Sequence, residues 1–116
     1  MDDMSNATGQ LMELVARAAA LSDPAQLRNL LQTGHTAWCE GLAEVRGEVF
    51  RRCAELDDAA VADWCRTAES PWEKGQPRSE AVSYLAFAVW DSSPAAMAYT
   101  VLEERASSFG VTLIAQ

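Results

Sequence analysis

The fold is decided by the longest patterned stretch of the chain, TAWCEGLAEVRGEVFRRCAEL, which covers residues 36–56. Its apolar residues recur every three or four positions, the spacing that places side chains on one face of an α-helix. The glutamates fall mostly off this face, so the pattern predicts a long helix that buries one side. The residues of the apolar face are Trp38, Leu42, Val45, Val49, Cys53 and Leu56.

Two glycines lie inside this pattern. Gly41 and Gly47 each weaken a helix by about 1 kcal/mol relative to alanine. Either they allow close contact with a neighbouring helix, or Gly47 marks a kink or a break in the helix.

Helix start signals lie on both sides of this stretch. Asp23 and Ser93 each precede a proline, which suits the first helical position because its missing N–H would have no partner there. Thr8 and Asp57 are the other predicted N-caps, because their side-chain oxygens can accept backbone N–H bonds. Residues 1–7 are predicted to form a flexible tail ahead of the first helix.

Glycine and proline mark where the helices end. Gly34 and Gly110 can adopt the left-handed conformation that closes a helix. We therefore expect a short helix to end at Thr33 and the next to begin at Thr36. Two prolines and a glycine within residues 70–77 predict a loop, because proline interrupts a helix.

The last two helices are predicted over residues 78–91 and from Pro94 to Gly110. The first is apolar around most of its circumference, which is typical of a central helix. A strand is the alternative for so short an apolar run, but three alanines within Ala81–Trp90 favour a helix. The predicted inner face of the last helix consists of Met97, Ala98, Val101 and Leu102.

Together these signals predict an all-α fold. We expect a compact antiparallel bundle of five to six helices, with a single domain over residues 8–116 and a short extended tail over residues 111–116. Trp38, Trp64 and Trp90 lie on the helical stripes and are predicted to be buried.

The charge balance limits the kind of partner. Nine basic and seventeen acidic residues give a net charge of −8, whereas nucleic acids and anionic membranes attract basic surfaces. We therefore expect neither as a partner, and we expect a basic protein surface instead. The acidic start of the sequence does not resemble a secretory leader, and no apolar run approaches the roughly 20 residues of a membrane span. A cytoplasmic protein is predicted.

The three cysteines and the one histidine are the side chains of the sequence that could carry metal or nucleophile chemistry. His35 and Cys39 stand four residues apart and, with Cys53 and Cys65, could supply a His-Cys₃ zinc set, although the spacing matches no compact zinc motif. The same pair could act as a nucleophile and its base, but nothing nearby supplies an orienting group. We therefore predict reduced, packed thiols, no metal, no cofactor and no catalytic residue.

The predicted function is non-catalytic binding of another protein. Trp72 lies between two prolines in the predicted loop, where it either anchors a partner or folds back over the core. Small acidic helical proteins of bacteria include inhibitors, immunity proteins, and secretion chaperones or adaptors, and we expect one of these classes. The alternatives are a homo-oligomer that pairs through Met97–Val101 and a small Cys/His enzyme. The predicted protein-binding residues are Trp72, Glu73, Glu40, Glu44, Glu48, Glu103 and Glu104.

Overall fold

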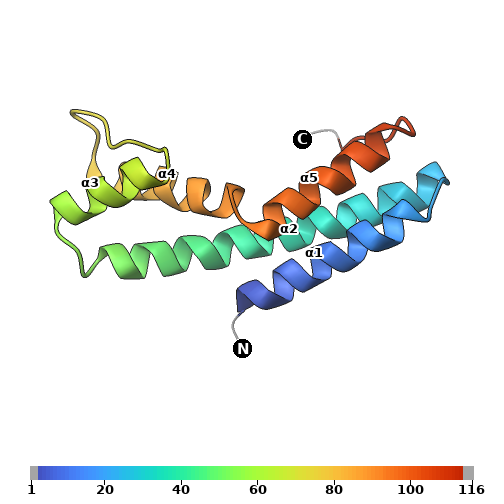
Figure 1. The fold of residues 1–116 in the computed structure, drawn as a ribbon, viewed down its shortest axis with the longest axis horizontal. Coiled ribbons are helices and arrows are strands. Elements are labelled where there is room, and N and C mark those ends of the chain that lie inside the picture. Colours follow the sequence, from blue (N-terminus) through green and yellow to red (C-terminus); the bar gives the residue numbers. More distant parts are fainter. Residues whose placement is uncertain (1–2, 114–116) are drawn as a thin grey trace. The chain divides into compact units, whose positions relative to one another are not determined.

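The computed structural model describes the backbone of residues 3–113 and the side chains of residues 9–113. Within these residues every regular element is helical and no strand occurs, so the all-α prediction is confirmed (Figure 1). The described part of the chain contains no helix that is both long and apolar enough to cross a membrane. The helices are α1 (Asp3–Ala19), α2 (Pro24–Cys53), α3 (Asp58–Thr67), α4 (Arg78–Asp91) and α5 (Pro94–Ser107).

The chain divides into two units. Unit 1 comprises Met1–Gly41 and Ser93–Gln116, and unit 2 comprises Leu42–Ser92. Helix α2 therefore contributes its first part to unit 1 and its second part to unit 2. The expectation of a single domain over residues 8–116 stays a prediction.

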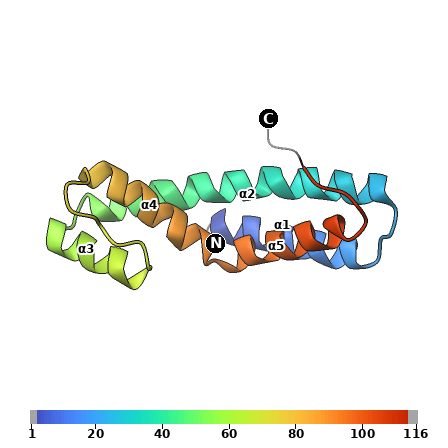
Figure 2. The ribbon, with the colours of Figure 1, turned by 90° about the horizontal axis from the view of Figure 1, so that it is seen from above.

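In unit 1, helix α1, the first part of α2 and helix α5 lie side by side (Figures 1 and 2). Each contributes apolar side chains at helical spacing, and their burial supplies the main stabilisation of this unit. Val111, which follows α5, is also buried, so this part of the predicted tail packs on the unit, whereas residues 114–116 lie outside the described residues. The buried leucines of unit 1 are Leu11, Leu14, Leu27, Leu30, Leu31 and Leu102.

In unit 2, the second part of α2 packs with α3 and α4 around a smaller core. The predicted apolar face of α2 is buried at Val45, Val49 and Cys53, whereas Leu56 lies beyond the helix and is 38% exposed. Trp90 is 1% exposed and belongs to this core, as predicted. Trp38 in unit 1 and Trp64 in unit 2 are only half-buried.

The predicted helix starts are mostly confirmed. Helix α3 is capped by Asp57, whose carboxylate accepts a bond of 2.9 Å from the Ala60 N–H. Helix α5 is capped by the Ser93 hydroxyl, with Pro94 in the first turn. The prediction that Thr8 caps the first helix is wrong, because α1 already begins at Asp3.

The predicted break at Gly34 is also wrong. Helix α2 continues through Gly34 and through Gly47, so neither glycine ends or breaks it. A Cβ atom at Gly34 would lie 2.7 Å from Leu102 Cδ2 and 3.3 Å from Tyr99 Cδ1. Gly34 thus allows α2 and α5 to approach closely, which explains a glycine in the middle of a helix.

Two predictions about which apolar residues are buried in the last helices are wrong. Helix α4 is not a central helix buried on all sides, as its apolar sequence had predicted, because Tyr84 is 56% and Phe87 47% exposed. On α5, Ala98 and Leu102 are buried, but Met97 is 56% and Val101 49% exposed. Each helix therefore presents one apolar strip to solvent.

Helices α3 and α5 end in the same backbone turn, but the residue in the left-handed conformation differs between them. Glu69 has φ 59°, and the next N–H, of Ser70, donates to Cys65 O at 2.8 Å. Gly110 has φ 77°, and the N–H of Val111 donates to Ala106 O at 3.0 Å. Both are Schellman motifs, in which the left-handed residue is usually glycine.

Replacing Glu69 with glycine is therefore expected to stabilise the protein by about 1 kcal/mol, because glycine has no Cβ to strain the left-handed conformation. The matched change, Gly110→Ala, should destabilise by about the same amount. Urea denaturation of both variants checks this pair. A loss of stability in Glu69→Gly would contradict the prediction.

Candidate functional site

The loop between α3 and α4 is held by its own hydrogen bonds. The indole N–H of Trp72 donates to the Gln76 carbonyl at 2.9 Å. The backbone N–H of Glu73 donates to Gln76 Oε1 at 3.1 Å. Residues 71–77 contain no helix, as predicted, and these bonds fix how the loop presents its side chains.

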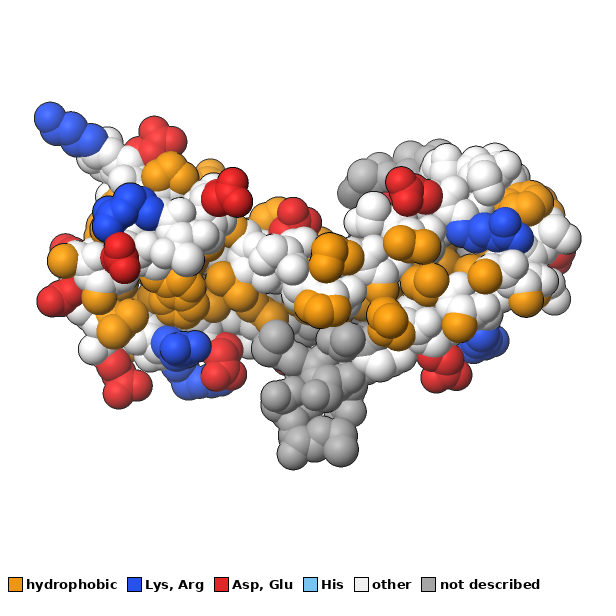
Figure 3. All heavy atoms as spheres, in the orientation of Figure 1, with side chains coloured by type: hydrophobic (Ala, Val, Ile, Leu, Met, Phe, Trp, Pro, Cys, Tyr) orange, Lys and Arg blue, Asp and Glu red, His pale blue; other side chains and the backbone are white. Residues whose placement is uncertain are grey.

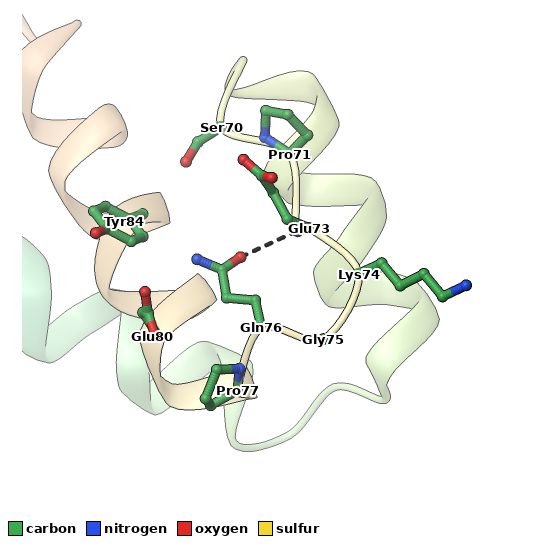
Figure 4. A pocket seen from close by; sticks show the side chains of 9 residues that line it. All are labelled: Ser70, Pro71, Glu73, Lys74, Gly75, Gln76, Pro77, Glu80 and Tyr84. Carbon is green, nitrogen blue, oxygen red and sulfur yellow. Dashed lines mark hydrogen bonds between the residues drawn. The ribbon is translucent and has the colours of Figure 1, made fainter.

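This loop and the first turns of α4 surround a hollow of about 620 Å³, which we call the loop hollow (Figure 4). Glu80 and Tyr84 face it from α4, one helical turn apart, whereas Glu73 and Gln76 approach from the loop. Lys74 also belongs to the lining, but its ammonium group points away. The lining residues are Ser70, Pro71, Glu73, Lys74, Gly75, Gln76, Pro77, Glu80 and Tyr84.

The loop hollow has two carboxylates, those of Glu73 and Glu80. Within the described residues, no ion pair joins either of them to a basic group. The arginines of unit 2 are engaged elsewhere by acids or aromatic rings. The pairs are Arg46 with Phe50, Arg51 with Glu48, Arg52 with Trp64, Arg66 with Asp63, and Arg78 with Asp58.

The predicted binding residues are distributed over both units. Trp72 and Glu73 are neighbours in the α3–α4 loop, and both donate hydrogen bonds to Gln76. Trp72 is half-buried and its N–H is satisfied within the loop. Glu44 and Glu48 lie on the unit 2 part of α2, where Glu48 pairs with Arg51 at 3.3 Å. The remaining three predicted residues, Glu40, Glu103 and Glu104, belong to unit 1.

The charges of unit 2 are mixed rather than gathered by sign. Over α3 and α4, Figure 3 shows acidic and basic side chains with apolar side chains between them. At physiological salt, interactions between exposed charges more than about 8 Å apart are largely screened. A partner docked on this surface therefore responds mainly to the charges close to it, such as those of the loop hollow.

Sequence reasoning missed Glu80 and Tyr84. Tyr84 lies within residues 78–91, which the sequence predicts to be a central helix, yet it is 56% exposed. The four-residue spacing of Glu80 and Tyr84 places them on one helix face and is visible in the sequence. Their relation to Glu73 depends on the course of the loop, which the spacing does not reveal.

The His35–Cys39 pair lies in unit 1. Cys39 Sγ is 3.9 Å from both ring nitrogens of His35, and the imidazole stacks on Trp38 with ring centroids 6.5 Å apart. Tyr99 packs against the same rings. The pKa of Tyr99 is raised to about 12, mainly by burial and to a lesser extent by the charges of Glu103 and Cys39. Its hydroxyl therefore stays protonated at neutral pH.

The four residues of the zinc set belong to different units of the chain. Cys53 and Cys65 are buried in unit 2, whereas His35 and Cys39 belong to unit 1. Among the described residues, no group of three or more His, Cys, Asp or Glu side chains is placed to hold a metal ion.

We expect only Cys39 to react rapidly with a thiol reagent such as DTNB in the native protein. Cys39 is exposed, whereas Cys53 and Cys65 are 2% and 0% exposed. Burial also raises the pKa of both buried thiols, which reduces the thiolate that reacts. All three thiols should react in denaturant, and Cys39→Ser should remove the fast phase. A fast phase that persists in Cys39→Ser would contradict this assignment.

No known protein family, curated protein or solved structure matches the chain. Function must therefore be inferred from the chemistry of its own surfaces. The loop hollow combines a fixed loop, an exposed aromatic ring and two carboxylates, an arrangement suited to binding a cationic group.

Proposed function

We propose that this protein is a non-catalytic binding module for a protein with a basic surface. The observation that carries the proposal is the loop hollow, which is lined by Glu73, Glu80 and the exposed ring of Tyr84, and in which neither carboxylate pairs with a basic group of the described residues. The net charge of −8 would favour encounter with a basic partner and disfavour nucleic acids and anionic membranes.

We also propose the biological class to which such a binding module belongs. A small acidic bacterial inhibitor or immunity protein, or a secretion chaperone or adaptor, would act in this way in the cytoplasm.

We further propose that the helices form an antiparallel bundle. Trp72 would support the loop from within, since its indole N–H is bound to the Gln76 carbonyl, while Glu40, Glu44, Glu48, Glu103 and Glu104 would add to the long-range attraction.

Affinity capture from the source cell tests this proposal. The immobilised full chain is incubated with lysate at low and at high salt, and retained proteins are identified and then purified. We expect a basic protein whose association rate falls steeply with ionic strength, because charge attraction accelerates encounter. Retention of only acidic proteins, or binding that is indifferent to salt, would refute it.

Self-association is a second candidate function. Met97 is 56% and Val101 49% exposed, and they stand four residues apart on α5. Such a pair could form the centre of an isologous contact between two copies. Sedimentation across a concentration series tests it: a mass that stays monomeric at high concentration, or a dimer unaffected by Val101→Glu, would exclude this interface.

A further inference from the structure

We propose that the loop hollow receives an arginine side chain of the partner, with its guanidinium stacked on Tyr84 and bonded to Glu73 and Glu80. This inference rests on the proposed function and specifies what the basic surface must present. It concerns unit 2 alone, because the loop and α4 both belong to that unit.

The residues that line the loop hollow indicate that its ligand is a cation. Carboxylates approach the hollow from two elements, Glu73 from the loop and Glu80 from α4 (Figure 4). The one basic residue of the lining, Lys74, directs its ammonium group away from them. An incoming cation would therefore find two acceptors that no described basic group occupies.

The loop hollow differs from other hollows of the protein in the charged residues of its lining. Three further hollows in the described part of the chain each have an arginine in their lining: Arg52, Arg17 and Arg78 respectively. At each of those places a guanidinium group of this protein already belongs to the lining. The one basic lining residue of the loop hollow is Lys74, whose ammonium group points away, and this hollow also has the exposed Tyr84 ring.

The aromatic ring favours arginine over lysine. A guanidinium is planar and weakly hydrated, so it can stack on a tyrosine while its N–H groups reach carboxylates at its edge. An ammonium group is compact and strongly hydrated, so it gains less from the ring. The hydrogen bonds of Trp72 and Glu73 to Gln76 hold the loop in place, which lowers the entropic cost of binding.

A peptide titration of the full chain tests the inference directly. The probes are acetylated, amidated Gly-Gly-X-Gly-Gly peptides in which X is arginine, lysine or citrulline, and amide chemical shifts are followed by NMR. We expect saturable shifts around Glu73, Gln76 and Tyr84 with the arginine peptide. The lysine peptide should bind about threefold more weakly, and the uncharged citrulline peptide should cause no saturable shift.

Variants assign the contacts. Glu80→Gln and Tyr84→Leu should each weaken binding of the arginine peptide by about threefold. Glu13→Gln removes the same charge at an exposed position on α1 outside the hollow and should leave binding unchanged. Far-UV circular dichroism verifies that each variant keeps its helices, because Glu80 also lies in the first turn of α4.

The inference is overturned if none of the peptides binds, if citrulline binds as well as arginine, or if Glu80→Gln and Tyr84→Leu bind like the wild type. The proposed function is judged separately with the purified basic partner. Should the partner bind a Glu73→Gln/Glu80→Gln/Tyr84→Leu variant with unchanged affinity, the arginine site is refuted while the binding module stands. If the peptides follow the expected order but no basic protein binds, the arginine site stands and the binding module is refuted.

Discussion

Replacing Gly34 with valine is expected to lower the free energy of unfolding by about 3 kcal/mol. A Cβ atom at this position would already lie 2.7 Å from Leu102 Cδ2, closer than carbon atoms pack. Leu102 is 0% exposed and Tyr99 is 7% exposed, so neither has free space into which to move. The two methyl groups of valine would force α2 and α5 apart. Urea denaturation followed by circular dichroism measures the loss.

Gly47→Ala is the matched control for this prediction. Gly47 also lies within α2, but the nearest atom to a Cβ there is Arg51 Nη1 at 3.7 Å, an ordinary contact. Alanine should therefore stabilise the helix by about 1 kcal/mol through its higher helix propensity. If Gly34→Val and Gly47→Ala shifted stability in the same direction, close packing at Gly34 would be refuted.

Replacing Arg105 with alanine should lower the free energy of unfolding by about 2 kcal/mol, which is the second largest effect expected. Its guanidinium donates to Ala18 O at 3.1 Å, to Ala19 O at 3.3 Å and to Leu21 O at 2.7 Å. The last carbonyls of a helix have no partner within that helix, so Arg105 of α5 caps the end of α1. In Arg105→Ala these partly buried carbonyls lose a charged donor.

Two comparisons make this prediction specific. Arg105→Lys keeps the charge but cannot reach three carbonyls with a planar fork, so it should recover only part of the loss. Arg66→Ala removes an arginine that is 65% exposed and pairs with an Asp63 that is 73% exposed, so it should cost no more than about 0.5 kcal/mol. Equal losses in Arg105→Ala and Arg66→Ala would mean that charge alone, and not the cap, matters.

Local signals allowed most helix boundaries to be predicted. Asp57 and Ser93 were identified as caps because the bonds they make reach only three residues along the chain. Pro24 and Pro94 begin their helices for equally local reasons. The predicted range of α4, residues 78–91, agrees with the structure.

Errors arose where the outcome depends on distant residues. A glycine that closes a helix and a glycine that admits a neighbouring helix look alike in a sequence. At Gly34 the decisive partners, Tyr99 and Leu102, lie more than sixty residues further on. The exposure of Tyr84 and Met97 likewise depends on which helices cover them, so apolar character alone suggested burial.

The candidate site was only partly predictable for the same reason. The sequence indicates Trp72, with its neighbour Glu73, because tryptophan is enriched among interface anchors. Glu80 and Tyr84 line the same hollow as Glu73 because of the course that the loop takes. The hydrogen bonds from Trp72 and Glu73 to Gln76 define that course, and bonds of this kind depend on backbone conformation.

The division of the chain has a consequence for the order in which the protein can form on the ribosome. Unit 2 is one uninterrupted segment, Leu42–Ser92, whereas unit 1 needs a second segment that begins at Ser93. Because translation proceeds from the N-terminus, every residue of unit 2 is synthesised before the α5 partner of α1 exists. We therefore expect protection of nascent chains from proteolysis to arise first within unit 2, and in α1 only after α5 has emerged.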